Sequence, residues 1–152
     1  MKEPRSVARH HSRRLALQVL YAADMALQSA GTVDFDATFD DVALPFDLPS
    51  GARAFAKELV AGVAAEREEI DARVASHARN WRVDRMATVD RNVLRLAVHE
   101  LLHGDVPHNV VINEAIELAR DFGSDRSPAF VNGVLDAIAR ELAEARAARV
   151  SR

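Results

Sequence analysis

The sequence predicts an all-α protein with no β-sheet. Apolar residues recur at the spacing of a buried helix face through most of the chain, and no stretch alternates between apolar and polar residues with period two. The chain has 152 residues, so it can bury roughly two-thirds of its unfolded surface and needs neither disulfides nor a metal to fold.

A long first helix is predicted over residues 6–29, which contain strong helix formers and neither glycine nor proline. Its apolar residues at helical spacing are Ala16, Val19, Leu20, Ala23 and Leu27. Residues 30–50 contain one glycine, two prolines and five aspartates, yet also apolar residues that can pack. We expect an acidic connection with room for one short helix rather than a flexible linker.

The middle of the chain predicts more helix after Ser50, which can act as an N-cap. Apolar residues repeat at spacings of four over residues 55–78. Either one helix or two helices broken near residues 66–71 would fit this pattern, and both alternatives stay open.

Three helices are expected over residues 88–152. Thr88 is expected to cap a helix that Gly104 ends, and Gly123 to end the next helix in a left-handed conformation. Ser127, followed by a proline, is a typical start of a final helix.

Composition excludes several classes of site. The chain has no cysteine, which rules out disulfides, thiolate metal sites and cysteine nucleophiles and favours a reducing compartment. It has no apolar run of about 20 residues, and no signal-peptide-like stretch follows its charged start. We therefore predict a soluble, cytoplasmic protein that does not contact the membrane.

Charge is polarised along the chain. The basic arm, residues 2–14, carries Lys2 and four arginines against one glutamate, a net +4, whereas the whole chain is −3 and the remainder therefore −7. A basic arm on an acidic body is typical of proteins that capture a polyanion.

The search for catalytic or metal sites favours neither. His99 and His103 share a helix face at i, i+4, and Glu100 follows the first of them, but the sequence shows no third ligand and the helix ends at a glycine. Glu114 and Glu117 are expected to be solvated, and no nucleophile elbow or phosphate-binding glycine loop occurs. We predict a protein that is not an enzyme and that needs no cofactor or metal.

The basic arm is the better candidate for a binding site. His10, Arg14 and Tyr21 share one helix face because steps of four, seven and eleven residues nearly close whole turns, and Gln18 lies beside them. An adjoining ridge is predicted from Arg5, Arg9 and Arg13. Cations, an amide and an aromatic ring are typical of single-stranded RNA recognition. A solvated basic terminus with Tyr21 in the core fits the arm equally well.

Four segments resemble the NusB family of bacterial transcription antitermination factors. They are residues 89–97 (VDRNVLRLA), 112–119 (INEAIELA), 130–136 (FVNGVLD) and, more loosely, 13–21 (RRLALQVLY). Their order and spacing fit too, so the resemblance extends over nearly the whole chain.

The resemblance implies one NusB-like domain over residues 1–152, built of two roughly perpendicular three-helix bundles at about 1–78 and 79–152. It further implies binding to boxA single-stranded RNA of ribosomal RNA leaders, together with the ribosomal protein NusE. Other Nus factors and RNA polymerase would complete the antitermination complex. Some members form homodimers that hide the RNA surface, so a homodimer is an expected alternative state.

Site residues follow from the same resemblance. The RNA-binding set comprises Arg13, Arg14, Gln18 and Tyr21 by position, Arg5 and Arg9 by composition only, and Arg126 and Phe130 near the turn at residues 123–127. Arg126 departs from the family, whose members often carry an acidic or amide residue there. The protein-partner set comprises Asp90, which matches an acidic position facing NusE, and, less specifically, Arg95 and Glu100.

Other interpretations remain at this stage. A NusB-like bundle also precedes the catalytic domain of some ribosomal RNA methyltransferases, but we expect no catalytic domain because the sequence ends at Arg152. A structural homo-oligomer, with the arm as a dimer contact, is a second alternative. We also expect Asn132 and Gly133 to serve folding, the glycine by permitting close helix contact and the asparagine by bonding a neighbouring backbone group.

Overall fold

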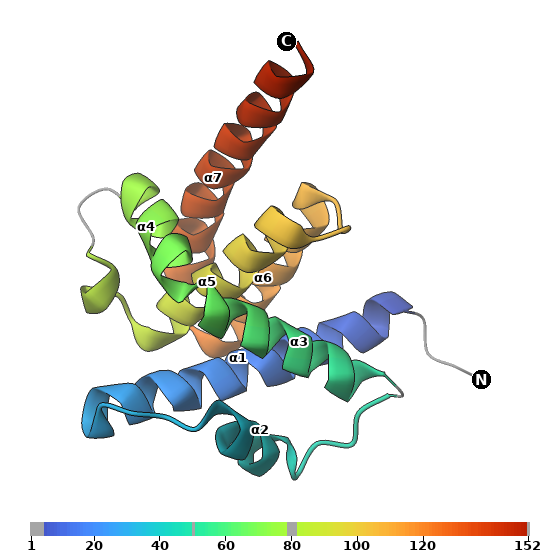
Figure 1. Cartoon of the computed structure of the whole chain (residues 1–152), viewed down its shortest axis with the longest axis vertical. Helices are drawn as coiled ribbons and strands as arrows, with labels where there is room; N and C mark the ends of the chain where they lie inside the picture. The colour runs from blue at the N-terminus through green and yellow to red at the C-terminus, as the bar shows by residue number, and fades with distance from the viewer. Residues whose placement is uncertain (1–4, 50, 79–81, 152) are drawn as a thin grey trace. The chain divides into compact units, whose positions relative to one another are not determined.

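The computed structural model describes residues 5–49, 51–78 and 82–151, and every regular element within these ranges is helical (Figure 1). The all-α prediction is confirmed. Lys2 and the predicted cap Ser50 lie outside the described residues. None of the described helices is both long and apolar enough to cross a membrane.

The chain divides into two compact units, Met1–Ala65 and Glu66–Arg152. We expected the boundary near residue 78, one helix later. Helix α4 (Arg67–His77) belongs to the second unit because it packs on helices of that unit, with Ile70 and Val74 buried. The perpendicular arrangement of two bundles stays a prediction.

The first unit contains α1 (Arg5–Ala30), α2 (Phe35–Ala43) and α3 (Ala52–Ala65), and α1 packs against both other helices (Figure 1). The long first helix and the short helix in the acidic connection are both confirmed. Asp34 starts α2, since its carboxylate accepts a hydrogen bond from the Ala37 N–H at 3.1 Å. Gly31 ends α1 with φ +79°, a left-handed conformation that favours glycine, and its N–H donates to the Leu27 carbonyl.

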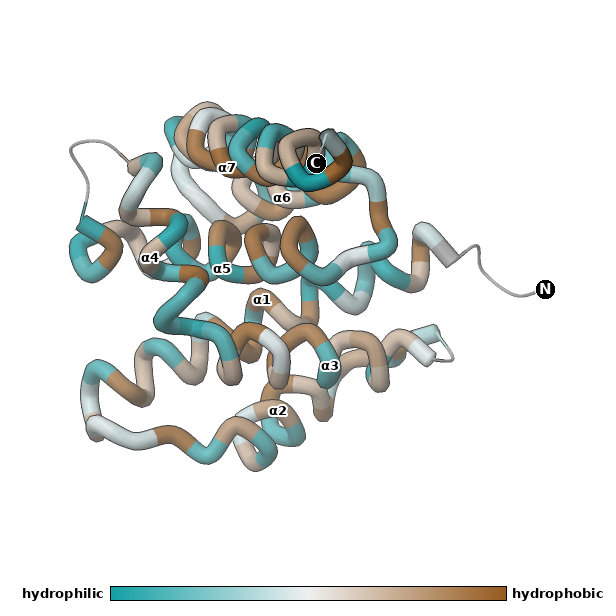
Figure 2. Tube along the Cα trace, turned by 45° about the horizontal axis from the view of Figure 1, so that its top comes forward, coloured by the Kyte–Doolittle hydropathy of each residue, from teal (hydrophilic) through white to brown (hydrophobic). Residues whose placement is uncertain are grey.

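The second unit contains α4, a 3₁₀ turn η1 (Val83–Arg85), α5 (Thr88–His103), α6 (His108–Phe122) and α7 (Ser127–Val150). Helix α5 packs against α4, α6 and α7, and residues 91–98 are all buried. Figure 2 shows much of α5 as hydrophobic. A polar residue on this helix must therefore find its partners inside the protein.

The open choice over residues 55–78 is settled in favour of two helices. Helix α3 ends at Ala65, and Glu66 leaves helical geometry with φ −117° and ψ 18° before α4 begins. The break lies at the edge of the interval that the sequence allowed.

Two helices begin at the residues that were predicted to cap them, Thr88 and Ser127, but neither residue is the cap. Thr88 is the first residue of α5, not its cap, and Ala87 before it offers no capping side chain. Ser127 is likewise inside α7, and its hydroxyl accepts a hydrogen bond from the Ser124 N–H at 2.9 Å, closing the preceding turn.

Gly123 is extended rather than left-handed, with φ −97° and ψ −162°. A Cβ atom at this position would lie 2.5 Å from Ser127 Oγ and 2.7 Å from the Ala119 carbonyl oxygen. Glycine is needed because the chain passes too close to its neighbours for a side chain.

We expected Gly133 to permit close contact between helices, but the structure shows no such contact. It is exposed, and a Cβ atom there would meet nothing within 4 Å. Asn132 is exposed as well. By contrast, Val131, Val134 and Leu135 on the opposite face of α7 are buried, as predicted from helical spacing.

Candidate RNA-binding interface

The exposed face of α1 carries the residue types that the sequence singled out. Tyr21 is 41% exposed, which excludes the interpretation that its ring is part of the core. Gln18 and Arg14 are half-buried, and the Gln18 Nε2 donates to the Arg14 carbonyl at 3.3 Å. His10 is half-buried on the same face. We call His10, Arg14, Gln18 and Tyr21 the α1 face.

The adjoining arginine ridge is placed differently. The Arg9 guanidinium lies 4.8 Å from the centre of the Phe55 ring of α3, a cation–π contact within the first unit. Arg13 is only 3% exposed. The Arg5 side chain lies outside what the structure describes, although its backbone begins α1. Of the ridge, Arg9 retains partial exposure and Arg13 would have to move to meet RNA.

Ser12 explains why this side of α1 is turned inward. Its hydroxyl donates to the Ala52 carbonyl at 2.7 Å, and that bond is buried. The bond ties α1 to the first residue of α3. The α1 face lies on the other side of the helix and is left accessible.

Arg126 and Phe130 lie at the start of α7 in the second unit. Arg126 is exposed in the turn before the helix, and Phe130 is half-buried in its first turn. Their accessibility is compatible with RNA contact. That they act together with the α1 face stays a prediction.

The predicted protein-partner residues on α5 fall into two groups. Asp90 is half-buried in the first turn, and its Oδ1 has no hydrogen-bond partner within the described part of the chain. Arg95 is 7% exposed and holds Asp71 through two bonds, Nε to Oδ1 at 2.8 Å and a terminal nitrogen to Oδ2 at 2.9 Å. Glu100 is 5% exposed. Asp90 is therefore the most exposed of the three predicted partner residues, although its Oδ1 atom is itself buried.

A second cluster joins α4 and α5. His103 Nε2 lies 2.7 Å from Glu66 Oε2, and His99 Nδ1 lies 3.6 Å from Glu66 Oε1. Burial lowers the pKa of His99 below its usual 6.5, and His103 adds to this effect, while Glu66 and Glu100 oppose it. Sequence reasoning missed Glu66, because no local spacing connects it with residues more than thirty positions further along.

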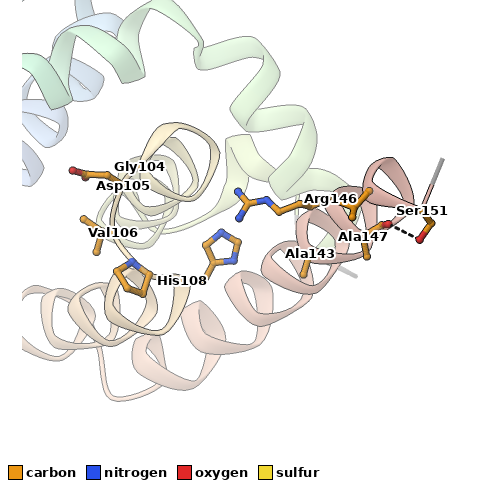
Figure 3. Close-up of a pocket in the computed structure, with 10 residues that line it drawn as sticks. Gly104, Asp105, Val106, His108, Ala143, Arg146, Ala147 and Ser151 are labelled. Carbon is orange, nitrogen blue, oxygen red and sulfur yellow. Dashed lines mark hydrogen bonds between the residues drawn. The ribbon is translucent and has the colours of Figure 1, made fainter.

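An open pocket lies between the turn at residues 104–108 and the end of α7 (Figure 3). Its charged or titratable lining groups are Asp105, His108 and Arg146. The lining includes none of the residues predicted to bind RNA or protein.

Comparison with known proteins decides the family. Residues 10–140 match the sequence model of the NusB family. The chain belongs to the NusB family. The predicted resemblance is confirmed over most of its length. The chain is 49% identical over 136 residues to the transcription antitermination protein NusB of Geotalea uraniireducens, covering 87% of this chain and 94% of that protein.

A second relative agrees. The NusB of Anaeromyxobacter dehalogenans is 49% identical over 141 residues, covering 91% of this chain and 94% of the relative. Both of these relatives share nearly their whole length with this chain, and both are named transcription antitermination protein NusB.

Solved structures of NusB proteins share the fold. T. maritima NusB superposes with a TM-score of 0.80 at 32% identity, over 93% of this chain and 94% of the other. A chain from a crystal structure of antitermination factors NusB and NusE in complex with double-stranded RNA gives a TM-score of 0.75 at 31% identity, over 88% and 97%.

Proposed function

We propose that this chain is a bacterial transcription antitermination factor that binds boxA RNA of ribosomal RNA leaders together with NusE. Through that complex it joins other Nus factors on RNA polymerase. It acts by binding rather than by catalysis, and a factor working on transcribing polymerase belongs in the bacterial cytoplasm. The α1 face carries the proposal, because it leaves a cation, an amide and an aromatic ring accessible on one side of a helix.

The chemistry of this face suits an RNA strand. Arg14 supplies a charge for phosphate, and the Tyr21 ring is exposed enough for a base to stack on it. Gln18 offers an amide that can bond a base edge if it releases the Arg14 carbonyl. A related chain in a solved complex with NusE and RNA adds support from the family.

The first test compares RNA affinity by gel shift for boxA RNA, a scrambled single strand and a duplex, each with and without NusE. We expect boxA to bind more tightly than the scrambled strand, and NusE to increase the difference. Equal affinity for both strands under all conditions would contradict boxA recognition.

Salt dependence tests the phosphate contacts. If about four phosphates are neutralised, log K falls against log salt with a slope of roughly −3, at about −0.7 for each contact. Arg14→Ala is expected to make the slope shallower by about 0.7. Arg140→Ala is the control, since Arg140 is exposed but pairs with Asp136 on α7, outside the proposed site. An unchanged slope in Arg14→Ala would remove Arg14 from the site.

The NusE surface is proposed to include Asp90, with Arg95 and Glu100 holding α5 in place rather than touching the partner. Asp90→Lys is expected to reduce NusE capture and to spare RNA binding. Asp84→Lys is the matched control, because Asp84 is an exposed acid in η1. Loss of RNA binding with intact NusE capture would reject the assignment.

Self-association is a further proposed state, in which a homodimer covers the RNA surface. Light scattering with and without boxA RNA tests it. A dimer that separates into monomers when RNA is added would support the proposal. A dimer that binds RNA without separating, or a monomer in both conditions, would oppose it.

A further inference from the structure

The cluster of Glu66, His99 and His103 supplies what the sequence lacked for a metal site. The sequence shows two histidines one helical turn apart at the end of α5, and the structure adds a carboxylate from the residue that precedes α4. One donor atom from each side chain lies within 4.8 Å of the other two. All three residues belong to the second unit.

The distances suit a shared ion. Two ligands of a tetrahedral zinc ion, each about 2.1 Å from it, lie about 3.4 Å apart. His103 Nε2 lies 2.7 Å from Glu66 Oε2 and His99 Nδ1 lies 3.6 Å from Glu66 Oε1, so the distances to the two carboxylate oxygens lie on either side of that separation. The two imidazole rings lie side by side, with their centroids 5.2 Å apart.

An unsatisfied nitrogen points to the same position. His99 Nδ1 is buried and has no hydrogen-bond partner among the described residues, and it faces Glu66 at a distance too long for a hydrogen bond. A buried polar atom without a partner is unfavourable, and a metal ion would satisfy it.

We propose that Glu66, His99 and His103 bind a divalent transition metal ion of the zinc type. Two imidazoles and a carboxylate are ligands that zinc accepts, and three protein ligands leave a fourth position for water. His103, whose side chain is 50% exposed, gives the ion access from solvent. The site joins the start of α4 to the last turn of α5, and none of its three residues is among those proposed to contact RNA or NusE.

The proposal covers binding and not hydrolysis. Residues 99–103 read His-Glu-Leu-Leu-His, the pattern in which the glutamate of a metalloprotease activates a metal-bound water. Glu100 is 5% exposed here and has its own interactions inside the protein.

The test uses the full-length untagged chain, titrated with Co²⁺ and followed by visible absorption, and with Zn²⁺ by calorimetry. We expect one ion per chain and a tetrahedral Co²⁺ spectrum. Glu66→Gln, His99→Gln and His103→Gln are each expected to weaken binding by at least about tenfold, since even residues that only orient ligands have effects of that size.

His77→Gln is the matched control. His77 also contacts a glutamate, Glu141, but no second histidine joins that pair in the described structure, so its replacement should leave Co²⁺ binding unchanged. Circular dichroism checks that each variant folds, and the exposed His103 variant remains informative even if the His99 variant does not fold. The absence of a Co²⁺ spectrum in the wild type, or wild-type affinity in the His103 and Glu66 variants, would overturn the proposal.

Discussion

The α1 face and helix α5 both carry arginine and amide side chains, but those of the α1 face are partly exposed and those of α5 are buried. Gln18 of α1 and Asn92 of α5 both donate to the carbonyl four residues earlier, at 3.3 Å and 2.8 Å. Arg14, however, is only half-buried, whereas Arg95 is 7% exposed and grips Asp71 with two bonds. An arginine in a binding motif is thus a contact residue or a scaffold residue according to its burial.

Arg91 is a second buried arginine of α5 that serves folding. It is 5% exposed, and one guanidinium nitrogen donates to the Val83 and Met86 carbonyls at 3.2 Å each. These bonds hold the segment that enters α5. The most family-specific stretch of α5 therefore contributes to folding more than to a surface.

The largest expected effect is a loss of folding stability when the buried arginine Arg95 is replaced. Arg95→Ala leaves the Asp71 carboxylate without its main partner, and because Asp71 is 25% exposed we expect a loss of about 3 kcal/mol, the low end for a broken buried pair. Urea unfolding measures it. Arg140→Ala removes an exposed pair on α7 and should change stability by less than about 0.5 kcal/mol. Equal losses of unfolding free energy in the two variants would contradict the distinction between buried and surface arginines.

The next effect concerns RNA. Tyr21→Ala removes a stacking surface proposed to contribute about 2 kcal/mol, so boxA affinity should fall roughly 30-fold. Tyr21→Phe keeps the ring and should bind nearly as well as the wild type. Affinity is measured by fluorescence anisotropy at fixed salt. If Tyr21→Ala binds like the wild type, the α1 face does not stack bases.

The sequence predicted the fold more fully than the site. Helical periodicity and the residues at helix ends located the helices, because both are local properties. Burial of Arg13 and the role of Arg95 could not be predicted, since they depend on partners far along the chain, such as Asp71. Glu66 escaped notice for the same reason.

The roles of two glycines were also predicted incorrectly from the sequence. Gly123 was expected to need a left-handed conformation, but it is required by the close approach of Ser127 and Ala119. Gly133 was expected to allow close packing, yet it faces open space. A glycine in the sequence therefore does not show whether its position needs glycine, or for which physical reason.

Gly133 provides a smaller, stabilising prediction. Because the position is exposed on a helix with room for a side chain, Gly133→Ala should raise the free energy of unfolding by about 1 kcal/mol. Urea unfolding measures the gain, and RNA and NusE affinities are measured in parallel. A stabilised variant that loses NusE binding would show that this face, rather than folding, explains the glycine. A destabilised variant would contradict the structure at this residue.

The smallest expected effect is on pH dependence. The pKa of His99 is lowered in the folded protein, so the unfolded chain takes up this proton first as pH falls through about 6.5. The contribution of neutral His99 to the free energy of unfolding is therefore complete above that pH and lost below it. Between pH 7.5 and 5.5 the wild type should lose more stability than His99→Gln, with Glu66, His103 and Glu100 unchanged in both. Identical pH profiles by urea unfolding would contradict this.

Ultraviolet crosslinking of boxA RNA, with the attachment sites located by mass spectrometry, tests most directly whether the α1 face binds RNA. We expect the main crosslink to form at Tyr21 and to weaken when scrambled RNA replaces boxA. Crosslinks confined to the second unit, with none in α1, would contradict it.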